Sequence, residues 1–457
     1  MDNKENCNLD NGSNDTTVQR KEKVVLDIDH SSVDENIPSE HHNSHHHSSH
    51  HSSHHSHHGS HHGKHRGGHH HRSHKHNSKK KFKFTSKLGW MIVICTVILF
   101  IVLLVIIDGR RTDHSDPSIG DQTSGILNVE VYNQEGLLVK NAVNKYLLTD
   151  LLNPANANVL PSQFANKDEG RLDTQVPVSL RLSVKEGSAI SYKIELATND
   201  SFANPQIYYL ESSSGVFDFK HLYTNTTYYY RVTVYTRQGT DTAMGQFKTA
   251  DTPRILSIDG LSNVRDIGNW RTDSGKRIKQ GLLIRGTEMD GAVESGYHLT
   301  NAGLVDMLEI FGIKTDIDLR AQTATSKDAL GSRVDHKYYD MVQYDGIFTD
   351  YGKEKIRMVF ADLANPDNYP IYLHCTYGCD RTGTICYLLE ALLGVSRGDC
   401  LKDYGLSNLN IANIQVIENG LKSYEGDTLK EQVESYLLSC GVSEYQISSI
   451  RNIFLGD

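Results

Sequence analysis

The chain has 457 residues, of which 23% are charged, and its formal net charge at pH 7 is −9. A chain of this length has room for more than one domain. A net negative charge is not typical of proteins that bind nucleic acid through an excess of Lys and Arg. We therefore expect no nucleic-acid partner.

The first 87 residues (1–87) are predicted to be a disordered, His-rich tail on the cytoplasmic side of a membrane. Residues 30–76 hold twenty of the chain's twenty-five histidines, interleaved with Ser and Gly. With almost no apolar residues, this tract cannot bury a core of its own. It becomes cationic as the pH falls through about 6.5, so we expect loose binding of Zn or Cu, or a response to acidity. A plain solvated tail is the alternative.

An uncharged apolar stretch follows the tail. Residues 88–107, LGWMIVICTVILFIVLLVII, contain no charged residue and no proline. About 20 apolar residues let a helix cross about 30 Å of hydrocarbon, so this stretch predicts a transmembrane helix. A signal peptide and a buried core helix are the alternatives, but the stretch lies far from the N-terminus and its apolar part is long for a signal.

The flanks of this stretch predict its orientation. Arg110 and Arg111 follow it, whereas six lysines precede it, namely Lys75, Lys79, Lys80, Lys81, Lys83 and Lys87. The positive-inside rule then places the N-terminus in the cytoplasm and the larger C-terminal part outside the cell or in a lumen. The basic run would also attract anionic lipid. Sequons that begin at Asn199 and Asn225 point to the same exterior placement.

The region 108–250 is predicted to contain a β-sandwich with a linker. Short runs rich in Val, Ile, Tyr and Phe alternate with Gly, Asn, Asp and Ser, at residues 176–184, 190–197, 207–211, 216–219, 228–235 and 244–249. This spacing is typical of a sandwich. Leu222 followed by Tyr228 resembles the tyrosine corner of fibronectin type III domains, although Thr224 stands where that corner usually has Pro.

The most informative stretch is HCTYGCDRTG at residues 374–383. A β-prone run, 369–373, precedes it, and a helix-like run, 382–393, follows it. A turn between a strand and a helix directs backbone N–H groups and the positive end of the helix inward, so it can hold a phosphate. The residues expected to form this phosphate-binding loop with the nucleophile are Thr376, Tyr377, Gly378, Cys379, Thr382 and Gly383.

The positive electrostatic potential of these N–H groups and of the helix end also acts on the first residue of the loop, which is a cysteine. It can lower a cysteine pKa from about 8.5 to roughly 3.5–7.5, which makes Cys375 a nucleophile at neutral pH. Arg381 offers a planar pair of donors to the oxygens of a phosphoryl group. We expect no metal and no cofactor. The alternative is a buried cysteine at a strand end beside an unrelated arginine.

The loop resembles the HCxxGKDRTG signature of the atypical, bacterial-type tyrosine phosphatases, a branch of the protein tyrosine phosphatase superfamily. Residues 263–268, 281–286, 315–320 and 403–408 resemble four further segments of that family in the same order. The resemblance covers about residue 254 to the C-terminus. It implies an α/β phosphatase domain over 251–457, with a central sheet flanked by helices, and hydrolysis through a cysteinyl-phosphate intermediate.

The resemblance also suggests roles for single residues. The aspartate inside the loop, here Asp380, would protonate the leaving group, and Asp345 and Asp350 are the alternatives. Other residues would support the loop, although Asp318 and Arg320 could instead form a structural salt bridge. The predicted supporting residues are His374, Asp318, Arg320, Arg265 and Asp266.

Cys379 stands where the family usually has lysine. The missing charge favours phosphotyrosine over highly anionic inositol lipids. A second thiol near the nucleophile also predicts reversible oxidation, unless Cys379 is a passive small residue. The cysteine usage is ambiguous. An exterior domain would pair its cysteines, and the four that could pair while Cys375 stays free are Cys379, Cys386, Cys400 and Cys440.

The predicted function is a protein tyrosine phosphatase, with dual specificity left open, whose partner is a phosphotyrosine protein or another phosphate monoester. The enzymatic alternative is a phosphoinositide phosphatase. A receptor-like protein that binds phosphorylated ligands without turnover is the alternative from another class. The predicted fold class combines the phosphatase domain, the all-β sandwich, one transmembrane helix and the disordered tail.

Overall fold

The computed structural model describes residues 125–211, 215–292, 296–321 and 328–456. The predicted tail (1–87) and the apolar stretch (88–107) lie outside the described residues. The metal binding expected of the His-rich tract therefore stays a prediction.

The predicted fold class and membrane location need correction. No helix in the described ranges is both long and apolar enough to cross a membrane. The longest there is α4 (Asp350–Leu363), with 14 residues, whereas a crossing takes about 20. Most apolar residues of these short helices are buried in the protein core. The described structure is a mixed α/β protein and does not support the predicted transmembrane helix. The predicted single-pass topology with an exterior catalytic domain depends on that helix, so it is not supported either.

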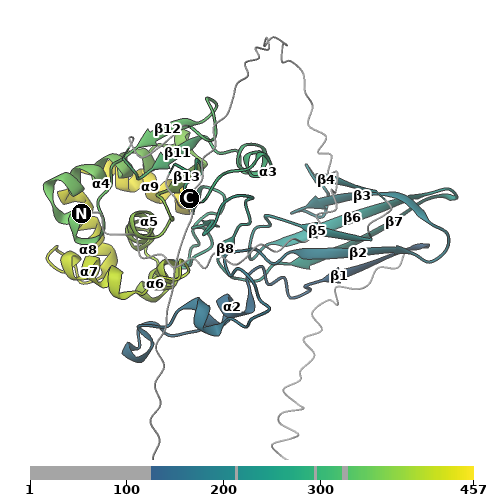
Figure 1. Ribbon diagram of the computed structural model, residues 1–457, viewed down its shortest axis with the longest axis horizontal. Coiled ribbons are helices and arrows are strands. Elements are labelled where there is room, and N and C mark those ends of the chain that lie inside the picture. Colours follow the sequence, from purple (N-terminus) through teal and green to yellow (C-terminus); the bar gives the residue numbers. More distant parts are fainter. Residues whose placement is uncertain (1–124, 212–214, 293–295, 322–327, 457) are drawn as a thin grey trace, which may run out of the picture. The chain divides into compact units, whose positions relative to one another are not determined.

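Two antiparallel sheets form the sandwich (Figure 1). One sheet has the order β1-β2-β5 and the other β4-β3-β6-β7. The six predicted runs are confirmed as strands, because alternating apolar side chains face the core between the sheets. Five of them differ from the strands by at most two residues at each end, whereas β7 begins five residues before the predicted run. The strands are β1 (Leu127–Tyr132), β2 (Val178–Val184), β3 (Ala189–Ala197), β4 (Gln206–Glu211), β5 (Val216–Phe219), β6 (Thr227–Thr236) and β7 (Gly239–Lys248).

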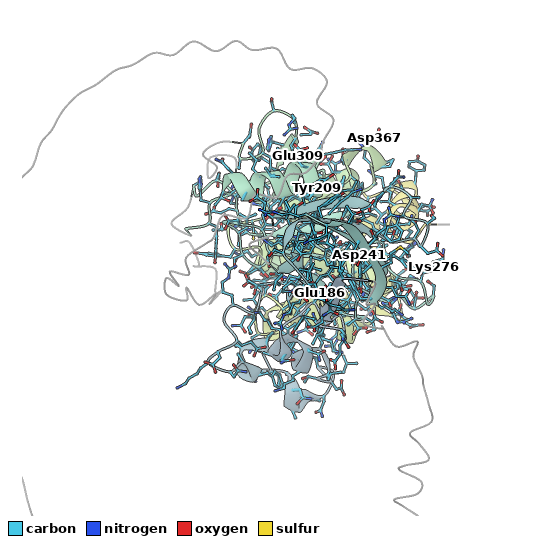
Figure 2. All side chains as sticks on the ribbon, turned by 90° about the vertical axis from the view of Figure 1, so that its right-hand side faces the viewer. Glu186, Tyr209, Asp241, Lys276, Glu309 and Asp367 are labelled. Atoms are coloured by element: carbon cyan, nitrogen blue, oxygen red, sulfur yellow. The ribbon has the colours of Figure 1, made fainter. Side chains whose placement is uncertain are left out.

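Two polar contacts close the sandwich at its ends. Asp241 in β7, labelled in Figure 2, accepts the backbone N–H groups of Ile126 and Leu127 at 2.8 and 2.9 Å. It thereby joins the start of β1 to the other sheet. The hydroxyl of Tyr228 accepts the backbone N–H of Tyr223 at 2.8 Å, which is the kind of bond that the predicted corner needs.

The segment between β1 and β2, residues 133–177, is here called the connecting segment. It contains α2 (Asn141–Leu147) and two short 3₁₀ turns, η1 (Pro154–Asn156) and η2 (Pro161–Phe164). Tyr146 and Leu151 are buried in the main core of the C-terminal domain rather than in that of the sandwich. This part of the predicted sandwich region therefore packs with the C-terminal domain.

The C-terminal domain is built on a six-stranded sheet with the order β12-β11-β13-β10-β9-β8. Strands β10 to β13 run parallel where they pair, and β8 and β9 are antiparallel. His374, the last residue of β13, lies opposite Gly286 on one side and Asp318 on the other. The carboxyl ends of three strands thus meet where the loop begins, the usual place for a ligand in such a sheet. The strands are β8 (Arg254–Ile255), β9 (Arg265–Asp266), β10 (Leu283–Gly286), β11 (Thr315–Asp318), β12 (Asp335–Tyr338) and β13 (Ile371–His374).

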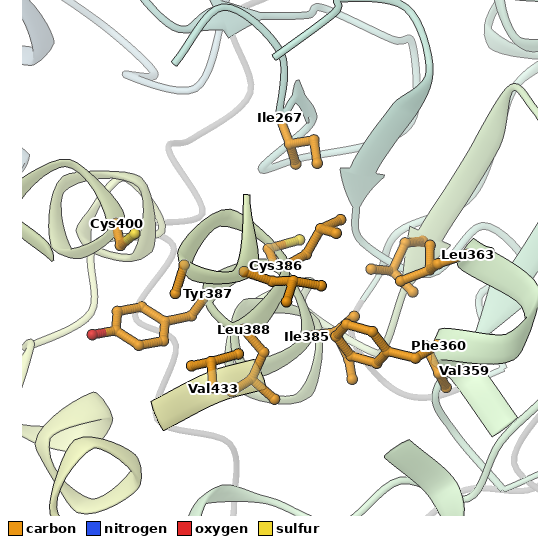
Figure 3. Close-up of a cluster of buried hydrophobic side chains, with 14 of the residues drawn as sticks. Ile267, Val359, Phe360, Leu363, Ile385, Cys386, Tyr387, Leu388, Cys400 and Val433 are labelled. Carbon is orange, nitrogen blue, oxygen red and sulfur yellow. The ribbon is translucent and has the colours of Figure 1, made fainter. Parts of the chain in front are cut away.

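Helices surround α5, which follows the loop (Figure 1). Nearly every residue of α5 is buried, which fits the apolar run at residues 385–389. Figure 3 shows Ile385 and Leu388 packed among Phe360 of α4 and Val433 of α8. Besides α4, the helical elements are α3 (Asn301–Val305), η3 (Asp306–Ile310), η5 (Tyr344–Phe348), η6 (Pro366–Asn368), α5 (Asp380–Leu392), α6 (Arg397–Gly405), α7 (Ala412–Leu421), α8 (Leu429–Ser439) and α9 (Glu444–Leu455).

Candidate active site

The predicted loop joins β13 to α5. Cys375 directly follows the strand, Asp380 is the first residue of the helix, and both are buried. Gly378 has a φ of +66°, and a Cβ at this position would lie 2.3 Å from the carbonyl oxygen of Gly286 at the end of β10. The tight approach of loop and strand therefore requires glycine.

The loop carbonyls are bound from outside the loop. Asn263 Nδ2 donates to the carbonyl oxygens of Tyr377 at 3.1 Å and Gly378 at 3.2 Å. Arg285 Nη2 donates to the carbonyl oxygen of Gly378 at 2.8 Å. In a trans peptide the C=O and the following N–H point in opposite directions. The N–H groups of Gly378 and Cys379 therefore turn toward the inside of the loop, where an anion can be held.

A buried ion-pair cluster supports these two donors. Asp403 in α6 accepts from Arg265 Nε at 3.0 Å and from Arg285 Nη1 at 2.8 Å. Arg265 Nη1 also donates to Asn263 Oδ1 at 2.6 Å. Burial alone would raise the pKa of Asp403, but the two guanidinium groups lower it below its ordinary value. Because the three side chains have almost no contact with water, removal of Asp403 would leave two buried guanidinium groups without the carboxylate that compensates their charge.

His374 lies between the loop and two carboxylates. Its Nε2 is 3.1 Å from Asp316 Oδ1 and 3.9 Å from Asp318 Oδ2. Burial alone would lower the pKa of His374, but the two carboxylates raise it to about 9. Burial would raise the pKa of Asp316, but the neighbouring His374 and His336 lower it to about 2. The imidazole is therefore cationic at neutral pH, directly beside Cys375.

Arg320 binds a group of carboxylates at the end of β11. Its Nη2 donates to Asp318 at 2.7 Å and its Nη1 to Asp290 at 3.1 Å, and Nη1 also donates to Glu288. Asp318 and Arg320 thus form a buried salt-bridge cluster, which reaches the loop through His374.

Asp380 and Arg381 complete the loop. The Asp380 carboxylate accepts the hydroxyl of Tyr344, from η5. The half-buried Arg381 guanidinium lies 3.4 Å from the carbonyl oxygen of Leu319 and 3.4 Å from Thr376 Oγ1. Of the three predicted candidates for the general acid, Asp380 is buried at the loop, whereas the rivals at 345 and 350 are exposed.

Asp266 does not reach the loop. Its carboxylate accepts from Arg254 Nη1 at 2.9 Å and from the backbone N–H groups of Gly268 and Gly281 at 2.8 and 2.5 Å. Arg254 also donates to the carbonyl oxygens of Leu222 and His221, at the end of the sandwich. Asp266 therefore holds the residue that contacts the sandwich, unlike its neighbour Arg265.

The pairing that the cysteine count allowed does not occur for three of the four cysteines. Cys386, Cys400 and Cys440 are free thiols, as is Cys375. Burial in the helical core raises the pKa of Cys386 to about 12. Since Cys375 is free, it is not joined to Cys379 in this structure, and a redox exchange between the two stays a prediction.

Sequence reasoning missed several functional positions. Asn263, Arg285 and Asp403 lie inside the segments that resemble the family, so the motif match was the available signal. Their individual roles depend on contacts such as that between Arg285 and Asp403, which are 118 positions apart. Tyr344 stands beside Asp345, and no pattern in the sequence marks it as the partner of Asp380. Within the described residues, no group of three or more His, Cys, Asp or Glu side chains is placed to hold a metal ion.

Comparisons with known proteins match the C-terminal part of the chain. A family model described as the tyrosine phosphatase family matches residues 256–441. A protein of Cupriavidus necator, provisionally named a tyrosine-protein phosphatase, is 27% identical over 227 residues, which cover 44% of this chain and 79% of that protein. A tyrosine-protein phosphatase of Nostoc commune is 30% identical over 126 residues, covering 22% of this chain and 42% of that protein.

Among solved structures, a β-glucuronidase of Parabacteroides merdae matches with 13% identity and a TM-score of 0.14. The match covers 56% of this chain and 40% of the β-glucuronidase chain. A likeness at that level supports no conclusion. The family match begins at residue 256, so the fibronectin type III resemblance of the sandwich stays a prediction. Through residues 256–441 the chain matches the tyrosine phosphatase family, and it is a phosphatase, as its loop predicts.

Proposed function

We propose that this enzyme hydrolyses phosphotyrosine in proteins through a cysteinyl-phosphate intermediate on Cys375. The observation that carries the proposal is the setting of Cys375, which opens a loop whose carbonyls are bound from outside and which ends at the N-terminus of α5. Inward amides, a helix N-terminus and the cationic His374 all favour a thiolate and a bound phosphate.

The reaction proceeds in two balanced steps. The Cys375 thiolate attacks phosphorus, so that an S–P bond forms while the ester P–O bond breaks. Asp380 gives its proton to the departing phenolate oxygen. Asp380 then takes a proton from water, whose oxygen attacks phosphorus, and the S–P bond breaks to release phosphate and restore the thiolate. Arg381 binds the equatorial phosphoryl oxygens throughout.

Two features of the loop favour phosphotyrosine. Cys379, which is fully buried, adds no cation where the family has lysine, so the attraction for multiply charged inositol lipids is reduced. Tyr377 in the loop packs edge to face with Tyr297, with their ring centroids 6.2 Å apart. These rings offer aromatic surface beside the loop, which suits a phenyl ring.

The role of Cys375 as nucleophile and that of Arg381 in binding the phosphoryl oxygens are tested with variants of the full chain. Cys375→Ser should abolish turnover of a phosphotyrosine peptide while binding remains, and Arg381→Lys should weaken both. Cys440→Ser, which changes another free thiol, is the control and should keep wild-type turnover. Turnover that survives Cys375→Ser would contradict the proposal. Faster wild-type turnover of a phosphoinositide than of the peptide would favour the lipid alternative, and wild-type binding without turnover would favour the receptor-like one.

The general acid is tested with substrates that differ in their leaving groups. Asp380→Asn should slow hydrolysis of an unactivated phenyl phosphate much more than that of a nitrophenyl phosphate, which needs little protonation. Asp345→Asn and Asp350→Asn are the matched controls. If either control shows this selective loss and Asp380→Asn does not, the acid role belongs to the control residue.

A further inference from the structure

A carboxylate from outside the family match reaches the residue that holds the loop. Asp173 belongs to the connecting segment, and its Oδ2 accepts the backbone N–H of Asn263 at 2.7 Å. The same oxygen accepts the hydroxyl of Ser262. Arg171 donates to both carboxylate oxygens of Asp173, at 3.0 and 2.9 Å. Burial alone would raise the pKa of Asp173, but the Arg171 guanidinium and the donors at 262 and 263 lower it.

The backbone that Asp173 binds has an unusual conformation. Asn263 has a φ of +53°, in the left-handed region that few residues other than glycine adopt readily. This conformation accompanies the inward turn of its side chain, whose amide donates to the carbonyls of Tyr377 and Gly378. Asp173 is therefore one residue removed from the phosphate-binding loop.

The connecting segment is anchored to the C-terminal domain on both sides of Asp173. Arg171 Nη2 donates to the carbonyl oxygen of Leu261 at 3.1 Å. Ser257 Oγ accepts the backbone N–H of Gln175 at 2.8 Å. Leu172 packs against a small buried cluster that includes Val143 and Ile255. Because the segment is held on both sides of Asp173, at Arg171 and at Gln175, its carboxylate has little freedom to move away from Asn263.

We propose that the connecting segment is part of the catalytic unit and that Asp173 is a positioning residue for the phosphate-binding loop, acting through Asn263. The carboxylate holds the left-handed backbone of Asn263, and the Asn263 side chain then holds the loop carbonyls outward and the loop amides inward. The inference rests on the proposed role of the loop and adds a residue from a part of the chain that the family match does not include.

The test uses full-chain variants Asp173→Ala and Asp168→Ala. Asp168 lies in the same segment with its side chain exposed, so Asp168→Ala is the matched control. Asp173→Ala should lower kcat/KM for a phosphotyrosine peptide by about 10- to 100-fold, the effect of a small misplacement of reacting groups. Asp168→Ala should match the wild type.

A second readout separates positioning from general loss of structure. The rate at which iodoacetamide alkylates Cys375 is followed against pH, with the modified peptide identified by mass. Less inward loop amides stabilise the thiolate less, so the midpoint should move to higher pH in Asp173→Ala and stay in place in Asp168→Ala. A folded Asp173→Ala variant with wild-type kcat/KM and a wild-type alkylation midpoint would overturn the inference.

A second variant at position 173 and a comparison with Cys375→Ser complete the test. If Asp173→Ala does not fold, Asp173→Leu replaces it, because leucine has a similar shape but no oxygen to accept the Asn263 N–H; an unchanged midpoint in that variant would overturn the inference equally. Failure of the proposed function would look different, since turnover would then survive Cys375→Ser whatever the residue at 173. The alkylation midpoint does not depend on the identity of the substrate.

Discussion

At the scale of single residues, His374 gives the domain a pH dependence. Its pKa is raised to about 9 in the folded protein, above the ordinary value of about 6.5. A histidine whose pKa is raised by folding stabilises the folded state. This stabilisation is complete at pH values below the pKa of the unfolded state, and it is lost as the pH rises through the pKa of the folded state. The contribution of His374 should therefore be complete below about pH 6.5 and disappear by about pH 9.

Urea unfolding at pH 6.5 and pH 9 measures this effect. The wild type should lose about 3 kcal/mol of unfolding free energy more than His374→Gln over this interval, since each pKa unit corresponds to about 1.4 kcal/mol. His298→Gln, which changes an exposed histidine, is the control and should behave as the wild type does. An equal pH dependence in His374→Gln and the wild type would show that the ion pairs with Asp316 and Asp318 do not stabilise the fold.

At the scale of elements, the loop depends on its packing against β10. Gly378→Ala adds both backbone strain and a clash with the carbonyl oxygen of Gly286. Gly312→Ala is a matched control, because Gly312 has a φ of +61° and no atom within 4 Å of the added Cβ. The control should lose about 1–2 kcal/mol from its backbone conformation, and Gly378→Ala about 1–3 kcal/mol more from overpacking.

The activities of these two glycine variants should differ more than their stabilities. Gly312→Ala should keep its kcat, whereas Gly378→Ala should lose most of it because the loop amides shift. Thermal unfolding and peptide turnover, measured on the same preparations, check both expectations. Equal kcat values in the two variants would mean that the contact between the loop and β10 does not matter for catalysis.

At the scale of the whole molecule, Arg254 joins the sandwich to the catalytic domain. Its guanidinium donates to the carbonyl oxygens of Leu222 and His221, at 3.0 and 2.6 Å, and to Asp266 at 2.9 Å. It also lies over the ring of Tyr223, with its central carbon 4.0 Å from the ring centroid. The described residues all fall in one compact unit, and the contacts of Arg254 help to join its two parts.

Arg254→Ala should destabilise the unit by about 3–5 kcal/mol, the usual cost of leaving one member of a buried ion pair without its partner. Calorimetry should show the single unfolding transition of the wild type broadened or split, because the sandwich would unfold separately. Arg181→Ala is the control: Arg181 is exposed and stacks on Tyr132 within the sandwich. An unchanged transition in Arg254→Ala would argue that the apolar contacts alone join the two parts.

The sequence by itself determined the features encoded in consecutive residues. The loop at 374–383, its strand and its helix follow from local spacing and apolar runs, and the sandwich strands follow from alternation along the chain. The phosphatase class follows from the loop and is confirmed by the family match. Each of these depends on interactions within a few residues, so a reader of the chain alone can find it.

Only the tertiary structure decided which distant residues meet. Arg285 and Gly378 are 93 positions apart, and Asn263 receives Asp173 from another part of the chain. No local pattern indicates these partners, because a buried ion pair or hydrogen bond is selected by the three-dimensional packing around it. The same reason explains the corrections: Cys386, Cys400 and Cys440 are free because the helical core keeps each thiol without a sulfur partner, although their number alone had suggested pairs.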